Sequence, residues 1–199
     1  MKVFVLLLCA VLIVGCTVAG VLAWVIDVSG PVINTFSASS IKIKLDESKY
    51  DPADNSLNKA ERVQSNDNYV MIPGWELPKD PKVTVEGGSE DCWLFIKLEK
   101  AEDVDAFLEY SIASGWTPLE GKTGIYCRKV SSSANDQSFE ILEGNKVTVK
   151  ETVSLENMQA LTENGKSPQM TFTAYAVQLK KGSGEFTAAE AWTEAEKLG

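Results

Sequence analysis

Histidine does not occur in the 199-residue sequence. It is the usual general base and zinc ligand of enzymes, and its charge changes near neutral pH. Its absence excludes His-Glu-x-x-His zinc motifs and Ser-His-Asp or Cys-His catalytic sites. Chemistry by two carboxylates stays open because Asp and Glu total 28, but no pair stands out by its spacing. We therefore expect a protein that is not an enzyme and that has no cofactor and no metal site.

Concentrated basic charge is also missing. The formal net charge is −9, and the acidic residues are scattered along the chain. Binding to nucleic acid requires clustered Lys and Arg, so we expect no nucleic acid partner. Scattered negative charge is typical of a soluble protein surface. Acidic surfaces also bind divalent cations, but the sequence has no loop with the spaced Asp and Asn ligands of an EF-hand.

The N-terminus has the order of a secretory signal peptide. A positively charged start is followed by an almost wholly apolar run over residues 3–14 and then by small residues up to Ala23. We predict a signal peptide over residues 1–23 that is cleaved between Ala23 and Trp24. The product would be secreted, and either extracellular or associated with the cell surface.

Two other interpretations of this segment stay open. Residues 3–26 are nearly long enough to span a bilayer as an uncleaved anchor. The run Ile13-Val14-Gly15-Cys16 resembles the lipobox after which bacterial lipoproteins are cut and lipidated on the cysteine. Gly15, Thr17 and Gly20 dilute the apolar run, so the pattern favours cleavage of a signal peptide over a membrane anchor.

Cysteine is scarce, with four residues, of which two fall inside the predicted signal peptide. Cys92 and Cys127 remain in the cleaved product, each in a strand-like segment. In an oxidising environment outside the cell they can form the one disulfide available to that product. We favour this disulfide over the alternative of two independent buried thiols that behave as small apolar residues.

The rest of the chain is typical of short β-strands. Alternating apolar and polar side chains, or short apolar runs, predict strands over residues 35–45, 82–86, 92–98, 108–112, 124–130, 139–142, 146–153 and 170–179. The 92–98 segment is the most apolar, so we expect it at the centre of a sheet. The simplest topology pairs the 108–112 and 124–130 strands across the loop between them.

Helices are expected only as connectors and at the C-terminus. The polar stretch 46–67 predicts a long surface excursion with a short helix near residues 57–64. Further helical segments are predicted at residues 103–106, after Ser154 and around Trp192. The pattern indicates a mainly β protein, a jelly-roll-like antiparallel β-sandwich with short connecting helices and a C-terminal helix. The predicted parts are a signal peptide at 1–23, an N-terminal arm at 24–36 and a sandwich domain at 37–199.

Six segments are notable for the order in which they occur: Ala23-Trp24-Val25-Ile26-Asp27, Asn34-Thr35-Phe36-Ser37-Ala38, Ile41-Lys42-Ile43, Lys79-Asp80-Pro81-Lys82-Val83-Thr84-Val85, Gly115-Trp116, and Phe172-Thr173-Ala174-Tyr175-Ala176-Val177-Gln178 followed by the Trp192 helix. In this order they resemble the TasA/camelysin family, which Gram-positive bacteria export with a dedicated signal peptidase. The resemblance covers nearly the whole chain. The sequence departs from the family pattern in having Cys16 in the signal and Trp24-Val25 in place of the aromatic pair.

This resemblance implies a jelly-roll subunit of an extracellular fibre in a biofilm matrix. Its partners would be copies of itself or related matrix subunits, with a signal peptidase acting during export. In such fibres the N-terminal strand of one subunit completes the sheet of the next. The alternative, which the residues leave open, is that residues 24–36 fold back as an edge strand of their own domain. The candidate apolar plugs of this arm are Trp24, Ile26, Val28, Val32, Ile33 and Phe36.

Two further functions stay as alternatives. A secreted carbohydrate- or host-binding adhesin could use Trp75, Trp93 and Trp116 as stacking platforms, although aromatic residues in strands usually belong to the core. Two of these rings exposed side by side at one cleft would favour it. A camelysin-like peptidase is implied by the label that some relatives carry, but the absence of histidine argues against a zinc site.

Overall fold

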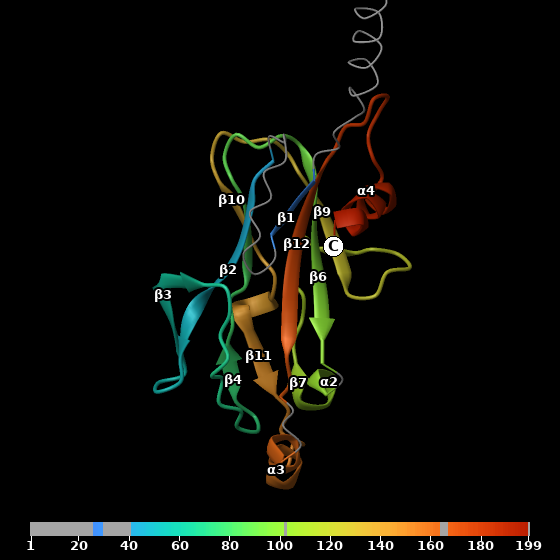
Figure 1. Ribbon diagram of the computed structural model, residues 1–199. Coiled ribbons are helices and arrows are strands. Elements are labelled where there is room, and N and C mark those ends of the chain that lie inside the picture. The colour runs from blue at the N-terminus through green and yellow to red at the C-terminus, as the bar shows by residue number, and fades with distance from the viewer. Residues whose placement is uncertain (1–25, 30–40, 102, 164–166, 199) are drawn as a thin grey trace, which may run out of the picture.

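The computed structural model describes residues 26–29, 41–101, 103–163 and 167–198 (Figure 1). Within them strands predominate, and the strand pairs are antiparallel. The strands are β1 (Ile26–Ser29), β2 (Ile43–Asp51), β3 (Ser56–Val63), β4 (Glu76–Pro78), β5 (Lys82–Val85), β6 (Cys92–Lys100), β7 (Leu108–Glu109), β8 (Thr117–Pro118), β9 (Ile125–Val130), β10 (Gln137–Glu140), β11 (Lys146–Val149) and β12 (Met170–Gln178). The helices are α2 (Val104–Phe107), α3 (Leu155–Glu163) and α4 (Ala188–Ala195), with the short 3-10 turns η1 (Glu143–Asn145) and η2 (Glu196–Leu198).

The strands form three sheets. The five-stranded sheet has the order β1-β12-β6-β9-β8, the four-stranded sheet β10-β5-β2-β3 and the three-stranded sheet β4-β11-β7. The two larger sheets share a common core, which confirms the predicted antiparallel β-sandwich. The predicted central position of the 92–98 segment is also confirmed, because β6 is the middle strand of the larger sheet. The jelly-roll form of the sandwich stays a prediction.

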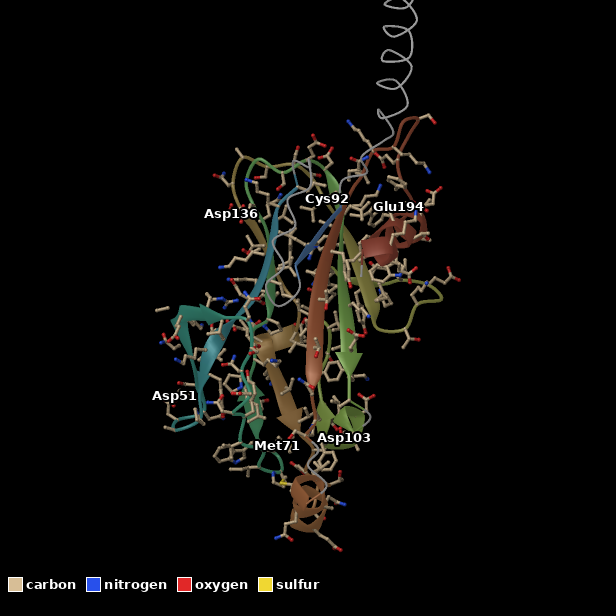
Figure 2. All side chains as sticks on the ribbon, in the orientation of Figure 1. Asp51, Met71, Cys92, Asp103, Asp136 and Glu194 are labelled. Atoms are coloured by element: carbon tan, nitrogen blue, oxygen red, sulfur yellow. The ribbon has the colours of Figure 1, made fainter. Side chains whose placement is uncertain are left out.

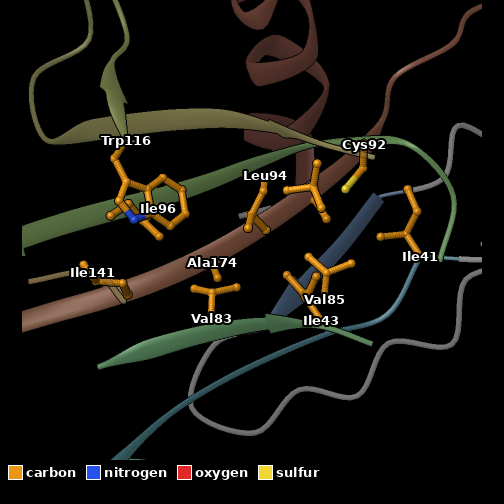
Figure 3. Close-up of a cluster of buried hydrophobic side chains, with 12 residues drawn as sticks. Ile41, Ile43, Val83, Val85, Cys92, Leu94, Ile96, Trp116, Ile141 and Ala174 are labelled. Atoms are coloured by element: carbon orange, nitrogen blue, oxygen red, sulfur yellow. The ribbon is translucent and has the colours of Figure 1, made fainter. Parts of the chain in front are cut away.

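Between the two larger sheets lies an inner core of apolar side chains (Figure 3). Leu94 and Ile96 of β6 face it from one sheet, and Val83 and Val85 of β5 face it from the other. These residues alternate with the side chains that point away, so the period of two in the sequence matches the pleat of each strand. The buried members of the inner core are Ile41, Ile43, Val83, Val85, Cys92, Leu94, Ile96, Trp116, Val130, Ile141, Ala174 and Ala176.

The opposite face of the five-stranded sheet carries an outer core that α4 covers. The Trp192 ring of α4 lies 5.4 Å from the Phe95 ring and 5.3 Å from the Tyr175 ring, between centroids. α4 begins with a capping box, in which the Thr187 hydroxyl accepts the Glu190 N–H and the Glu190 carboxylate accepts the Thr187 N–H. The predicted C-terminal helix is confirmed. The buried members of the outer core are Phe95, Leu119, Ile125, Cys127, Tyr175, Val177, Phe186, Ala191, Trp192 and Ala195.

The three-stranded sheet lies with α2 and α3 at one end of the molecule (Figure 1). Leu77 and Val149 come from its strands and join a third buried cluster. α2 adds Val104 and Phe107 to the same cluster. The small sheet therefore packs as a separate layer that closes this end of the sandwich.

Two local predictions are wrong. Residues 57–64 lie largely in β3 and not in a helix, and β3 forms with β2 a hairpin that projects from the body, with Asp51 near its tip (Figure 2). β7 pairs with β11 and not with β9, whose neighbours are β6 and β8. In both cases the partner strand decides the pairing, because strand formation depends on packing context more than on local preference.

Candidate functional site

β1 lies at one edge of the five-stranded sheet and is the described part of the predicted N-terminal arm. Its ladder with β12 places Ile26 opposite Val177 and Ser29 opposite Ala174. β1 also lies close to β2 and to α4. In this structure a strand of the same chain therefore covers the edge of β12.

The part of β12 that pairs with β1 is buried. Residues 174–177 are buried on both faces, with alanines against the inner core and Tyr175 and Val177 against the outer core. Backbone N–H and C=O groups in such a setting must be paired. Residues 170–173 of β12 pair with β6, and no second strand lies beside them within the described residues. Among the described strands, β1 thus covers the edge of β12 over only part of its length.

Most of the predicted arm falls outside the described residues. Among the plug residues, Ile26 and Val28 are described, and Val28 lies opposite Tyr175. The sequence left open whether the arm pairs with another subunit or folds back on its own domain. In this structure β1 folds back on its own domain. The predicted cleavage site lies outside the described residues, between Ala23 and Trp24. The same holds for the other plug residues, Trp24, Val32, Ile33 and Phe36.

The predicted disulfide is wrong, because Cys92 and Cys127 are both free and buried. In the β6–β9 ladder Cys92 lies opposite Val130, whereas Cys127 lies opposite Phe95. An odd offset places two side chains on opposite faces of a sheet. Cys92 accordingly belongs to the inner core (Figure 3) and Cys127 to the outer core. Burial raises the pKa of the Cys92 thiol to about 12 and also raises that of Cys127, so both behave as small apolar residues.

The three tryptophans considered as stacking platforms lie in different surroundings. Trp116 is 7% exposed in the inner core and donates its indole N–H to the Glu140 carbonyl at 2.8 Å. Trp93 packs against the outer core and donates to the Phe186 carbonyl at 2.7 Å. Trp75 is 46% exposed in the turn before β4. They do not form the pair of exposed rings that would favour an adhesin.

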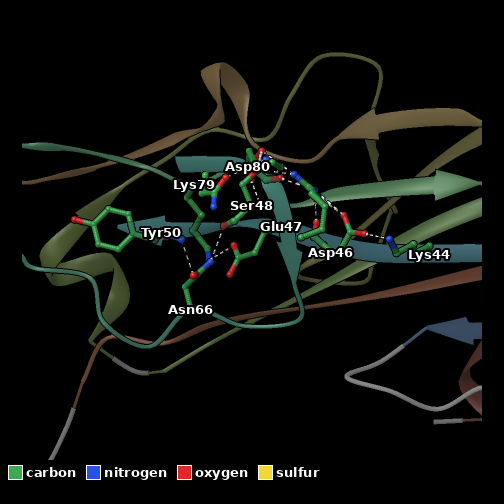
Figure 4. Close-up of polar contacts among 11 residues, drawn as sticks. Lys44, Asp46, Glu47, Ser48, Tyr50, Asn66, Lys79 and Asp80 are labelled. Carbon is green, nitrogen blue, oxygen red and sulfur yellow. Dashed lines mark hydrogen bonds and ion pairs between the residues drawn. The ribbon is translucent and has the colours of Figure 1, made fainter. Parts of the chain in front are cut away.

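The base of the β2–β3 hairpin holds a charged network that the sequence did not indicate (Figure 4). We call its members Asp46, Ser48, Arg62 and Asp80 the hairpin latch. Arg62 donates from Nε to Asp46 at 2.7 Å, and from Nη1 to Asp80 at 2.9 Å and to the Ser48 hydroxyl at 2.8 Å. Asp80 also accepts the hydroxyl and the N–H of Ser48, each at 2.7 Å. Because Asp80 lies between β4 and β5, the latch fastens the hairpin to the body.

Asp46 stays ionised in this network. Burial alone would raise the pKa of its carboxyl, but hydrogen bonds from Lys44 and Arg62 outweigh burial and hold the pKa below its ordinary value of 3.8. Next to the latch, Lys79 pairs with Glu47 at 2.7 Å, and both side chains are largely buried. The carboxylates here are already held by cations and hydroxyls, so the arrangement stabilises the hairpin. Among the described residues, no group of three or more Cys, Asp or Glu side chains is placed to hold a metal ion.

Comparisons of the chain with protein-family models, with curated protein sequences and with solved structures gave no match. None of the helices among the described residues is long and apolar enough to cross a bilayer. Function is therefore inferred from the residues and the geometry of this chain.

Proposed function

We propose that this protein is a structural subunit of an extracellular fibre, exported to the surface or the biofilm matrix of a Gram-positive-type cell. Its subunits join when the N-terminal strand of one copy pairs with β12 of the next. The signal-like N-terminus and the resemblance to the TasA/camelysin family support export and the matrix setting. The pairing of β1 with β12 at the edge of the sheet is the observation that carries the proposal. β1 follows directly after the predicted cleavage site, so cleavage would leave this strand at the free N-terminus.

The β1–β12 ladder is suited to exchange between copies. It is short, running from Ile26 opposite Val177 to Ser29 opposite Ala174. When β1 of a second copy takes the same place, each backbone hydrogen bond is replaced by an identical one, so the exchange costs little interaction energy. A head-to-tail exchange of this kind does not close on itself and builds a filament.

The connection between β1 and β2 is long enough for the exchange. It runs over residues 30–42, and a chain of this length spans about 40 Å when extended. In the proposed filament this connection bridges the body of one copy and β12 of the next. Residues 170–173 of β12, which pair on one side only within the described part of the chain, offer further backbone groups to an incoming strand.

A disulfide placed across the ladder distinguishes donation from fold-back. In the Asp27→Cys, Ala176→Cys double variant the two new thiols lie opposite each other. Donation puts them on different subunits, so oxidised filaments dissolved in detergent should give a ladder of covalent oligomers on a gel without reductant. If the filaments yield only cross-linked monomers, strand donation is refuted. The native thiols at Cys92 and Cys127 are buried and do not compete.

Matched controls keep this result specific. Each single variant should give no ladder. The pair Asp27→Cys, Thr171→Cys should also give none, because Thr171 lies opposite Glu99 of β6 and far along the strand from the partner of Asp27. Ladders of equal strength from this mismatched pair would indicate random collision of subunits.

Removal of the arm tests assembly itself. Protein that starts at Trp24 should form filaments under the electron microscope, and protein that starts at Ser37 should form none. The shorter protein also loses β1, so its circular dichroism spectrum must be compared with that of the longer one to show that the sandwich persists. Filaments formed by a folded protein without residues 24–36 would show that the arm is not the connector.

A further inference from the structure

Arg128 lies on β9, a strand near the edge of the five-stranded sheet that has only the short β8 beyond it. β8 pairs with β9 only at Tyr126 and Cys127, so from Arg128 onward the outer edge of β9 has no partner strand within the described residues. β10 is the last strand of the facing sheet. A cavity of about 260 Å³ lies at this side and is lined by residues that include Arg128 of β9 and Phe139 of β10.

The guanidinium of Arg128 is held in place by apolar contacts. Its carbon lies 4.0 Å from the centroid of the Phe139 ring and 5.4 Å from that of Trp116. Trp116 is itself fixed by its hydrogen bond to the Glu140 carbonyl. The guanidinium also lies against Gly115, where a Cβ atom would come within 3.3 Å of both terminal nitrogens. Gly115 therefore leaves the room that the guanidinium occupies.

Polar partners for this cation are missing within the described residues. Its Nε is buried and has no hydrogen-bond partner. None of the ion pairs in the described part of the chain includes Arg128. Buried arginine donors are normally satisfied, and an unpaired one in a native protein points to a missing partner. Burial also lowers the pKa of the guanidinium, as expected for a cation without a counter-charge.

Glu143 supplies a carboxylate to the same cavity. It accepts the N–H of Ser114 at 3.2 Å. Glu140 also borders the cavity, but it follows Phe139 on β10, and successive side chains of a strand point to opposite faces, so its carboxylate lies on the other face from the Phe139 ring. Glu143 belongs to no ion pair among the described residues. A cavity with one cation and one carboxylate matches a ligand that carries both a negative and a positive group.

We propose that this cavity binds a free amino acid, with its carboxylate on Arg128 and its ammonium group facing Glu143. The planar guanidinium suits a carboxylate because it offers two parallel N–H donors. The volume lies just below the usual range of ligand pockets, about 300–1,000 Å³, which fits a small ligand. Binding pairs the terminal nitrogens of Arg128 and the Glu143 carboxylate at once.

The arginine side-chain signals give a direct test on the purified protein. The chain contains two arginines, Arg62 and Arg128, so the Nε–H region of a nitrogen–proton spectrum holds two signals. Addition of glycine or alanine should shift the Arg128 signal to saturation, and Arg62, which is fully paired, should stay in place. Acetate carries only the carboxylate and methylammonium only the cation, so each should bind at least about tenfold more weakly. Equal binding of acetate and glycine, or no shift at Arg128 with any probe, overturns the proposal.

Variants followed by calorimetry complete the test. Arg128→Gln should abolish saturable binding of glycine. Glu143→Gln keeps an oxygen for Ser114 and should weaken glycine binding while leaving acetate binding unchanged or stronger. Glu185→Gln serves as the control, because this exposed acid pairs with Lys129 and should affect neither probe. Glycine binding by Arg128→Gln at the affinity of the unmodified protein would end the proposal.

Discussion

Arg62 and Arg128 are the two arginines of the chain, and their surroundings are opposite in character. Arg62 is surrounded by the carboxylates of Asp46 and Asp80 and by the Ser48 hydroxyl. Arg128 is packed between aromatic rings, and its Nε has no partner. One cation holds two parts of the fold together. The other is held in position by the fold, and its buried Nε makes no hydrogen bond within the described residues.

The largest effect is expected from Arg62→Met. The change leaves the largely buried carboxylate of Asp80 without a cation and that of Asp46 with Lys44 alone, and breaking a buried pair from one side in this way should lower the free energy of unfolding by about 2–4 kcal/mol. Urea denaturation followed by circular dichroism measures it. Lys49→Met is the matched control on the same hairpin, because Lys49 and Glu61 form an ion pair that is about half exposed and worth less than about 1 kcal/mol. Equal losses in the two variants would contradict a special role for the latch.

The latch should also weaken in acid. The pKa of Asp46 lies below its ordinary value of 3.8, so its stabilising contribution is complete above the pKa of the unfolded chain and is lost as the pH falls through the folded one. Asp46→Asn should be less stable than the unmodified protein at neutral pH, by about 1–2 kcal/mol. Its stability should then fall less steeply on acidification. Denaturant midpoints measured from about pH 7 to about pH 3 check this. Parallel curves for the two proteins would rule out Asp46 as the source.

The smallest effect is expected from Arg128→Met. Loss of the contacts with Phe139 and Trp116 is unfavourable, but removal of a partly buried cation without a partner is favourable. The two contributions nearly cancel, so the free energy of unfolding should change by less than about 1 kcal/mol. The same denaturation experiment measures it. A loss as large as that of Arg62→Met would show that Arg128 also holds the fold together, and the contrast between the two arginines would disappear.

The sandwich core could be predicted from the sequence because its strands obey a simple period. Leu94 and Ile96 alternate with Phe95, and the structure places them in the inner and outer core, respectively. The C-terminal helix was also predictable, since Thr187 is a good N-cap residue and Trp192 lies on its buried side. Local rules suffice where each residue acts through its own strand or helix turn.

Features that depend on register or on distant partners could not be predicted. The two cysteines lie in neighbouring strands, but the register of the pairing places their side chains on opposite faces of the sheet, and neither segment alone reveals that offset. Residues 57–64 are polar and compatible with a helix. They pair as a strand with β2, and Arg62 among them finds its counter-charges in Asp46 and in Asp80, which is distant in sequence. The proposed ligand site at Arg128 was inferred because its Nε has no hydrogen-bond partner within the described residues, and a sequence pattern does not show such an absence.

The two buried cysteines can serve as natural probes for partial unfolding of the protein, because they lie in different cores. We expect a thiol-labelling reagent to reach Cys127 once α4 lifts from the five-stranded sheet, and Cys92 when the two large sheets separate. Detachment of a single terminal helix requires less free energy than separation of the sandwich. Mass spectrometry of the labelled peptides therefore records the two events as separate rates, with no engineered probe.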